Sequence, residues 1–370
     1  MEDSGSGLKD LEEFIRQGGI GEKPMMSFKK QGKDLQIPLG AVWLMNSISE
    51  YKGKQELYAR QSPQILKTLL EIALIESAES SNRIEGVTVD KNRLKPLIIG
   101  HSRPHDRSEE EVVGYRKALD LIHKKHRSLD ISAEIIKELH RLSQAEKGDA
   151  GKWKTKNNEI IRKNPDGSVE VIFKPLEARL VPKAIDQLCL GYKHSIDQLK
   201  YPDLYAVSCL ILDFLCIHPF RDGNGRVSRL LALLALYHHG YEVGRYISLE
   251  RIIEQSKETY YEALQKSSQG WHEAKHDISP WLHYFLGTIN SAYKEFEQRA
   301  GSVKSPKGAK TEIVIQTINN QQGEFSISEV ERLCPGISRD MIRLVFRQLK
   351  KEKKIICLGK GQQAKWRRIG

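Results

Sequence analysis

The stretch that decides the fold of this chain is His218-Pro219-Phe220-Arg221-Asp222-Gly223-Asn224-Gly225-Arg226-Val227-Ser228-Arg229-Leu230-Leu231. Residues 210–216 before it and 230–237 after it are apolar enough to predict two buried helices. The stretch therefore predicts a short polar loop that two core helices hold in place. Binding and catalytic side chains are often carried by loops that a rigid scaffold positions.

Several residues of this loop indicate phosphate chemistry. Glycines at the start of a helix let backbone N–H groups converge where the helix dipole favours negative charge. Arg226 and Arg229 follow on one side of the helix, so both guanidinium groups can reach a polyphosphate. Asp222 offers an oxygen ligand suited to Mg²⁺ shared with phosphate, and His218 offers a titratable base. Together they predict phosphoryl or nucleotidyl transfer, although each alone is compatible with a structural role.

The composition predicts a cytoplasmic protein of two or three domains. The chain has 370 residues, an acidic and polar start that argues against a signal peptide, and no apolar run near the ~20 residues of a membrane span. Its five cysteines are an odd number without paired metal spacing, so we expect them to be reduced and mostly in the core.

The net charge of +11 is unevenly distributed. Residues 301–370 hold nine Lys and six Arg against five Glu and one Asp. This asymmetry favours an anionic partner, nucleic acid first, while a well-solvated basic surface is the alternative.

The pattern of apolar and turn residues along the chain predicts a mainly all-α fold. Residues 1–60 are a weakly patterned arm with one short helix at 8–17 and Gly- and Lys-rich connections. A helix from about 62 to 86 follows, with Ser62 as N-cap and Pro63 at its first position. Two amphipathic helices lie between 108 and 145. Residues 160–173 predict a β-hairpin around the turn 164–168, for which a plain surface loop is the alternative.

The last part of the chain predicts a separate small domain. Residues 301–309 have the composition of a linker, and residues 310–370 predict three helices and two short strands, which look like a winged-helix domain. Its third helix would present Arg339, Arg343 and Arg347 to a DNA major groove, with Lys360 and Lys365 on the wing. Protein docking or dimerisation is the alternative role.

One motif points to a different chemistry. Residues 272–276 match HExxH, in which two His one helical turn apart bind zinc and the Glu is the base. Gly270 precedes the motif and Pro280 follows it, and the segment is short and polar. We therefore do not expect a zinc site here.

The central loop resembles the motif of the Fic family, HPFx(D/E)GNGRxxR. The chain matches every fixed position, with His218, Pro219, Phe220, Asp222, Gly223, Asn224, Gly225, Arg226 and Arg229. The resemblance extends less sharply over residues 60–290. It implies a Fic-type helical catalytic domain over 61–300 with a β-hairpin flap.

The resemblance also implies an activity: transfer of AMP from ATP to a Ser, Thr or Tyr hydroxyl of a target protein or of the chain itself. His218 would deprotonate the hydroxyl and Asp222 would bind Mg²⁺. The residues that would hold the nucleotide are Gly223, Asn224, Gly225, Arg226 and Arg229 on the phosphates and Tyr261 beside the adenine. The hairpin would pair with the target strand, with Ile172 and Phe173 as its clamp.

The helix that ends at Gly86 resembles the family's inhibitory motif, (S/T)xxxE(G/N), through Ser81 and Glu85. A Glu85 carboxylate paired with Arg229 would occupy the guanidinium that must otherwise receive the γ-phosphate. Glu85 positioning a water that removes AMP is an alternative, as is a DNA-binding regulator with a secondary Fic core. Pairing of two copies through the core, as in related chains, is left open by the residues.

Overall fold

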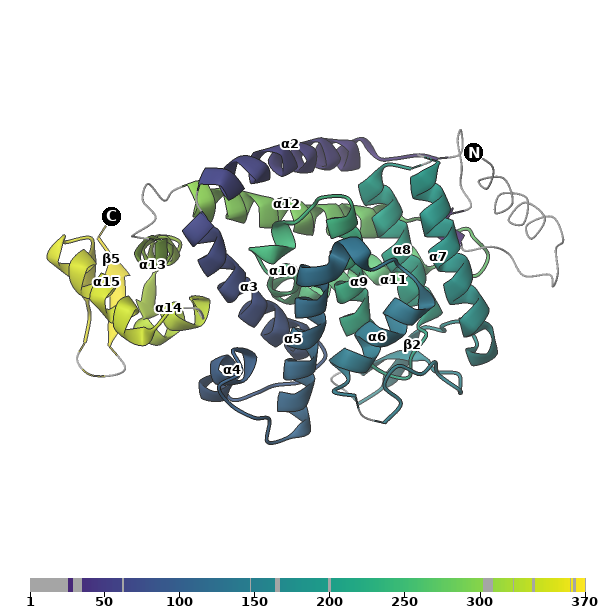
Figure 1. Cartoon of the computed structure of the whole chain (residues 1–370), viewed down its shortest axis with the longest axis horizontal. Coiled ribbons are helices and arrows are strands. Elements are labelled where there is room, and N and C mark those ends of the chain that lie inside the picture. The colour runs from purple at the N-terminus through teal and green to yellow at the C-terminus, as the bar shows by residue number, and fades with distance from the viewer. Residues whose placement is uncertain are drawn as a thin grey trace.

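The computed structural model describes residues 26–28, 35–61, 63–146, 148–163, 167–198, 201–301, 309–321, 323–334, 337–359, 361 and 364–369. The predicted mainly helical fold is confirmed (Figure 1). The helices of its larger part are α2 (Leu39–Gln61), α3 (Pro63–Ile84), α4 (Lys91–Ile98), α5 (Arg107–Lys125), α6 (Ala133–Ser143), α7 (Val181–Asp197), α8 (Asp203–Ile217), α9 (Asn224–His238), α10 (Leu249–Gln255), α11 (Lys257–Ser268) and α12 (Ser279–Gly301). Short 3₁₀ turns are η1 (Met26–Phe28), η3 (His126–Ser128), η4 (Ala178–Leu180) and η5 (Val243–Arg245). Within the described residues, no helix combines the length and the apolar character needed to span a membrane.

The helices α8 and α9 form the centre of the molecule. Both are buried on nearly all sides, which is why their sequences are apolar without a polar face. Helices α5, α6, α7 and α12 pack around them. The polar loop 218–223 therefore leaves and re-enters the most tightly packed part of the fold.

A buried carboxylate fixes α8 close to this loop. Asp213 is fully buried and accepts hydrogen bonds from Ser27 N (3.1 Å), Ser27 Oγ (2.6 Å) and Trp271 Nε1 (2.7 Å). Burial raises the pKa of Asp213 to about 6, against the effect of these hydrogen bonds. The contacts tie η1 and the segment after α11 to α8, little more than one turn before His218.

The HExxH segment is not a helix. His276 Nε2 lies 2.9 Å from Ser27 Oγ, and His272 Nε2 donates to Lys174 O (2.8 Å) from a turn. The described residues contain no group of three or more His, Cys, Asp and Glu side chains that could hold a metal ion. The two histidines therefore connect loops to one another.

The cysteines agree with the prediction. Four of them are buried, and these four and Cys357 are all free.

Residues 39–61 differ from the prediction. They form a helix that the sequence did not predict, α2, which lies along α12 (Figure 1). Its apolar residues do not keep to one face: Ala41 and Ile48 are buried, whereas Leu39, Val42 and Trp43 are exposed, Trp43 to 67%. The expected helix at 8–17 lies outside the described residues. Helix α3 begins at Pro63 as predicted, and Ser62 lies outside the description.

The β-hairpin is present. Strands β1 (Ile160–Lys163) and β2 (Val169–Phe173) pair antiparallel, with Ile161 opposite Val171. The turn 164–166 lies outside the described residues.

The C-terminal part contains α13 (Ala309–Asn319), α14 (Ile327–Leu333), α15 (Arg339–Lys351) and strands β3 (Glu324–Ser326), β4 (Ile355–Cys357) and β5 (Lys365–Arg368). The strands form an antiparallel sheet in the order β3-β5-β4, so β3 adds a strand that the sequence did not predict. Phe325, Phe346 and Trp366 form its aromatic core. Helix α13 packs against α3. The winged-helix assignment stays a prediction, and most of the proposed linker and Lys360 lie outside the description.

The anchor at Asp213 gives a first prediction. Trp271→Phe removes the indole donor from a buried carboxylate, so we expect the free energy of unfolding at pH 8 to fall by about 1.5–3 kcal/mol. The loss should shrink at pH 5, where most of the Asp213 carboxyl is protonated and the bond is no longer charge-assisted. Denaturant unfolding at both pH values measures the change.

Trp43→Phe is the matched control, because Trp43 is mostly exposed, and we expect a change within about 0.5 kcal/mol. Equal losses for the two variants would contradict the role given to the Asp213 anchor.

Candidate active site

The backbone of the central loop is fixed by its own side chains. Helix α8 ends at Ile217, and the residue that caps it, His218, has the left-handed dihedrals φ 52° and ψ 62°. The Asn224 carboxamide accepts from Phe220 N (2.9 Å) and donates to Phe220 O (2.9 Å). The Phe220 ring is fully buried and stacks on His140 at a centroid distance of 3.7 Å. Asn224, expected to hold phosphate, thus uses both ends of its carboxamide inside the loop.

The imidazole of His218 is arranged to act as a base. Its Nδ1 lies 3.3 Å from the carbonyl of Leu215, which can only accept, so Nδ1 carries the proton and Nε2 keeps its lone pair. Burial first, and then the charge of Lys154, lower the pKa of His218 to about 4. The ring is therefore neutral at physiological pH.

Asp222 offers a carboxylate to solvent. Its side chain is 71% exposed, Oδ1 accepts from Gly223 N (2.7 Å), and Oδ2 lies 3.9 Å from Arg226 Nη2. A single exposed carboxylate beside a phosphate cradle suits Mg²⁺, which takes its remaining ligands from phosphate and water. These residues fit the metal that the sequence implied.

A histidine that the sequence did not single out holds the backbone of Asp222. His140 Nδ1 accepts from Gly151 N (2.8 Å), so its Nε2 carries the proton and donates to Asp222 O (3.0 Å). Burial lowers the pKa of His140 to about 4, which keeps this arrangement uncharged. On α6 it looks like any residue of an apolar face, and no sequence signal marks it.

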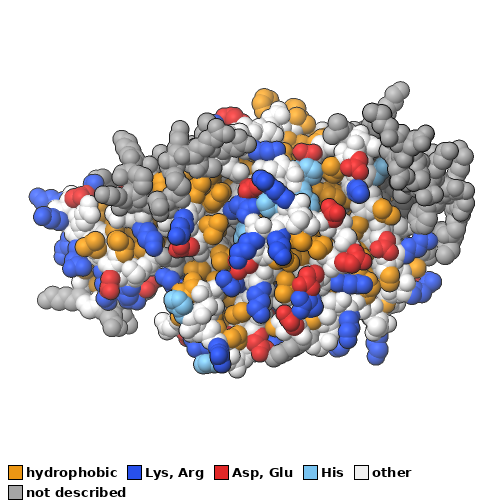
Figure 2. Space-filling view, viewed as in Figure 1, with side chains coloured by type: hydrophobic (Ala, Val, Ile, Leu, Met, Phe, Trp, Pro, Cys, Tyr) orange, Lys and Arg blue, Asp and Glu red, His pale blue; other side chains and the backbone are white. Residues whose placement is uncertain are grey.

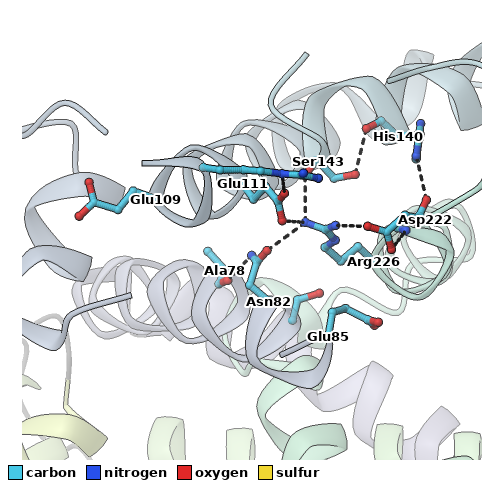
Figure 3. A network of polar contacts seen from close by, with 12 residues as sticks. Ala78, Asn82, Glu85, Glu109, Glu111, His140, Ser143, Asp222 and Arg226 are labelled. Carbon is cyan, nitrogen blue, oxygen red and sulfur yellow. Dashed lines mark hydrogen bonds and ion pairs between the residues drawn. The ribbon is translucent and has the colours of Figure 1, made fainter. Parts of the chain in front are cut away.

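Arg226 is buried in a polar network that joins three helices (Figure 3). Its Nη1 donates to Glu111 on α5 (2.7 Å), to Asn82 Oδ1 on α3 (3.3 Å) and to Ser143 O on α6 (3.3 Å). The side chain is 2% exposed. Arg226 therefore cross-links α3, α5 and α6 next to the loop. Its role as a phosphate ligand stays a prediction.

Arg229 contacts the end of α3. Its Nε donates to Ser81 Oγ (2.9 Å), and its Nη2 donates to Ser81 O (2.9 Å) and to Glu85 Oε1 (2.7 Å). Burial alone would lower the pKa of Arg229, but the Glu85 carboxylate holds it above its ordinary value. Nη1 has no hydrogen-bond partner among the described residues. The pairing implied by the resemblance is therefore present as a contact.

Gly225 makes room for this contact. A Cβ atom at Gly225 would lie 2.2 Å from Glu85 Oε1 and 3.2 Å from Arg229 Nη1. Any side chain here would thus push the Glu85 carboxylate away from Arg229. Gly225, a predicted phosphate-binding position, is thus also the surface against which the Glu85 carboxylate packs.

Two further groups of predicted residues surround the loop. Tyr261 is 42% exposed, and partial burial and then the nearby Glu85 carboxylate raise its pKa, which places it beside Glu85.

On the hairpin, Phe173 stacks on His272 at a centroid distance of 5.5 Å and Ile172 is half-buried. The exposed apolar side chains of the hairpin are instead Ile161, Val169 and Val171. The strand alternation could have indicated this face.

Comparison with known proteins agrees with the resemblance of the loop. Residues 130–236 match the model of the Fic/DOC family. A Fido domain-containing protein of Dictyostelium discoideum is 29% identical over 131 residues, which cover 34% of this chain and 87% of that protein. These matches support placing the chain in the Fic/Fido domain family. Fic domain proteins are commonly transferases, AMPylators among them.

Solved structures share the fold. A Fic family protein from Desulfovibrio desulfuricans G20 aligns over 91% of this chain and 98% of its own, with a TM-score of 0.58 and 21% identity. A Fic domain containing signaling protein from Bacteroides thetaiotaomicron aligns over 70% of this chain and 99% of its own, with a TM-score of 0.59 and 20% identity. The similarity in fold to these structures therefore extends well beyond residues 130–236, which the family model matches.

The network around Arg226 gives a second prediction. Glu111→Ala leaves the buried guanidinium without its carboxylate, so we expect the free energy of unfolding to fall by about 3–5 kcal/mol. Arg107→Ala is the control, because Arg107 bonds the other oxygen of Glu111 but its side chain is 74% exposed. We expect that control to cost less than about 1 kcal/mol. Denaturant unfolding measures the loss of unfolding free energy in both variants. If Arg226 were not a structural cross-link, the two losses would be equally small.

Proposed function

We propose that this chain is a protein adenylyltransferase, which transfers AMP from ATP to a Ser, Thr or Tyr hydroxyl of a target protein or of itself. The observation that carries the proposal is the neutral His218 imidazole, whose Nε2 lone pair is free beside an exposed Asp222 and the N-terminus of α9. A base, a carboxylate for Mg²⁺ and an anion cradle on one loop are the parts that nucleotidyl transfer needs.

In this mechanism His218 Nε2 takes the proton of the target hydroxyl, and the oxygen attacks the α-phosphorus of ATP. Pyrophosphate leaves with the electrons of the broken bond. Backbone N–H groups at residues 224 and 225 and the unpartnered Nη1 of Arg229 would stabilise phosphate charge. Mg²⁺ held by Asp222 would neutralise charge on the phosphate oxygens. Tyr261 would lie along the adenine, and the hairpin would hold the target strand.

We further propose that the resting enzyme is inhibited by Glu85. With its Nη2 paired to Glu85 and Ser81, Arg229 has only Nη1 left for a phosphate. ATP would then bind without the γ-phosphate contact that orients its α-phosphate for attack. The alternative, in which Glu85 holds a water that removes AMP from a target, uses the same carboxylate and is tested by the same variants.

The third prediction concerns labelling. With ATP labelled at the α-phosphate, we expect Glu85→Gly to raise protein labelling by about tenfold or more, which corresponds to ~1.4 kcal/mol of barrier. His218→Ala in the same background should abolish it. Glu273→Gly, which removes an exposed carboxylate from another turn, is the control and should change nothing.

ATP labelled at the γ-phosphate should give no labelled protein. Label from the γ-phosphate would show phosphorylation instead, and equal labelling by the wild type and Glu85→Gly would disprove the inhibition. Loss of AMP from a pre-labelled target on adding the wild type, but not Glu85→Gly, would favour removal of AMP.

A second candidate function, duplex DNA binding, rests on the C-terminal part. Arg343, Arg347 and Lys351 are exposed at four-residue spacing on α15, and β5 adds Lys365, Arg367 and Arg368. Figure 2 shows Lys and Arg side chains over this end of the molecule. Arg339 differs from the expectation, because it donates to Glu331 (2.7 Å). Leu344 is 52% exposed on α15, which keeps protein docking as the alternative.

The fourth prediction tests this surface in the full chain. Replacing both Arg343 and Arg347 by Ala should weaken binding to a DNA duplex and reduce the slope of log affinity against log salt by about 2, since each phosphate contact contributes about 1. Lys294→Ala, an exposed lysine of α12, is the control. Fluorescence anisotropy over a salt series measures both quantities. Affinity that does not depend on salt would argue against DNA.

A further inference from the structure

A segment between α6 and the hairpin runs against the catalytic loop. Gly151 N donates to His140 Nδ1 (2.8 Å), and the Trp153 ring packs on Phe220 at a centroid distance of 4.9 Å. Lys154 N donates to Pro219 O (2.8 Å). The segment thus contacts the loop at Trp153 and Lys154, and its Gly151 bonds the His140 side chain that holds the backbone of Asp222.

The Lys154 side chain returns to the same loop. It is 6% exposed, and its Nζ donates to Asn158 Oδ1 (2.7 Å) and to Ile217 O (3.4 Å). The backbone amide and the ammonium group of one residue therefore bond the carbonyl groups on either side of His218. No other described residue outside the loop is hydrogen-bonded to both of these carbonyls.

The bracketed residue needs such support. His218 adopts φ 52° and ψ 62°, a conformation that costs a residue with a Cβ atom about 1–2 kcal/mol. Ile217 is the last residue of α8, and carbonyls of a last helical turn lack partners within the helix. A cation at that end is also favoured by the helix dipole. Lys154 therefore supports the left-handed residue, gives the Ile217 carbonyl a donor and places a cation at the C-terminal end of α8.

The charge of Lys154 also acts on the imidazole. The charged groups that face His218 are Lys154, Glu85 and Asp222; the first lowers the pKa of His218 and the two carboxylates raise it. Burial has the largest effect and also lowers it. Lys154 therefore offsets the two carboxylates. Burial lowers the pKa of Lys154 itself to about 8, so part of its charge is lost above that pH.

We propose that Lys154 is a positioning residue for the general base: it holds His218 in its left-handed conformation through the carbonyls of Ile217 and Pro219 and places an ammonium group near the ring. The inference rests on the proposed adenylyl transfer for its kinetic consequence. Its structural part concerns only the conformation and protonation of His218. Nothing in the sequence marks Lys154, because the two carbonyls that it bonds lie more than 60 residues away.

The fifth prediction uses the active Glu85→Gly background. Lys154→Met should lower kcat for AMP transfer by about tenfold to a hundredfold with little change of KM for ATP, because a displaced base slows the chemical step without removing a nucleotide contact. Lys154→Arg should recover most of the rate.

Lys137→Met is the matched control. Lys137 lies over the Trp153 ring (4.8 Å) in the same region but contacts neither carbonyl, so kcat should stay unchanged. An NMR titration of the His218 ring is independent of activity: its pKa should rise in Lys154→Met and not in Lys137→Met.

Unchanged kcat and unchanged His218 pKa in Lys154→Met would overturn the proposal, and so would equal effects of the two Met variants. If Lys154→Met does not fold, kcat and the His218 ring titration of Lys154→Gln decide, since values identical to the parent would contradict the role of the ammonium group. If no variant transfers AMP, the proposed function fails while the ring titration still decides the position and charge of His218.

Discussion

The buried guanidinium of Arg229 is the interaction on which the arrangement of the site depends. A cation removed from water must keep acceptors, because breaking a buried pair costs several kcal/mol. In this structure the end of α3 supplies them, through Ser81 Oγ, Ser81 O and Glu85. The end of α3 thus stays docked until another anion replaces it. A phosphate group has the charge and the oxygen geometry to do so, so the inhibition that we propose would be an exchange of anions on one fixed cation.

Helix α3 connects this exchange to the rest of the molecule. Asn82 bonds Arg226, so α3 contacts both Arg226 and Arg229 of α9. Arg83 forms a bidentate pair with Glu254 (2.7 and 2.9 Å), and Lys257 Nζ donates to Ile84 O (2.7 Å). Farther along, α13 packs on the same helix. The element that ends at the active site is therefore also the one that contacts the C-terminal part.

The sequence was sufficient where local pattern and fixed spacing determine structure. The pair α8 and α9, the loop between them and the hairpin follow from apolar runs and turn residues, and the pairing of Glu85 with Arg229 followed from the family resemblance. Helix α2 was missed because its stability comes from packing on α12 rather than from its own pattern. Glu111, His140 and Lys154 were missed because each acts on a residue far away in the sequence, and a buried polar contact leaves no periodic signal.

The two partners of the central ion pair differ in how easily they can move. The side chain of Arg229 is 3% exposed and bonded at two nitrogens, whereas that of Glu85 is 27% exposed and has its one described ion pair here. A carboxylate already near water recovers its hydration at little cost when it leaves, but a buried guanidinium does not. In the proposed exchange, Glu85 would therefore be the partner that leaves and Arg229 the one that stays in place. Gly225 lies under the Glu85 carboxylate and has no side chain. A phosphate that replaced Glu85 would therefore meet no side chain at this position.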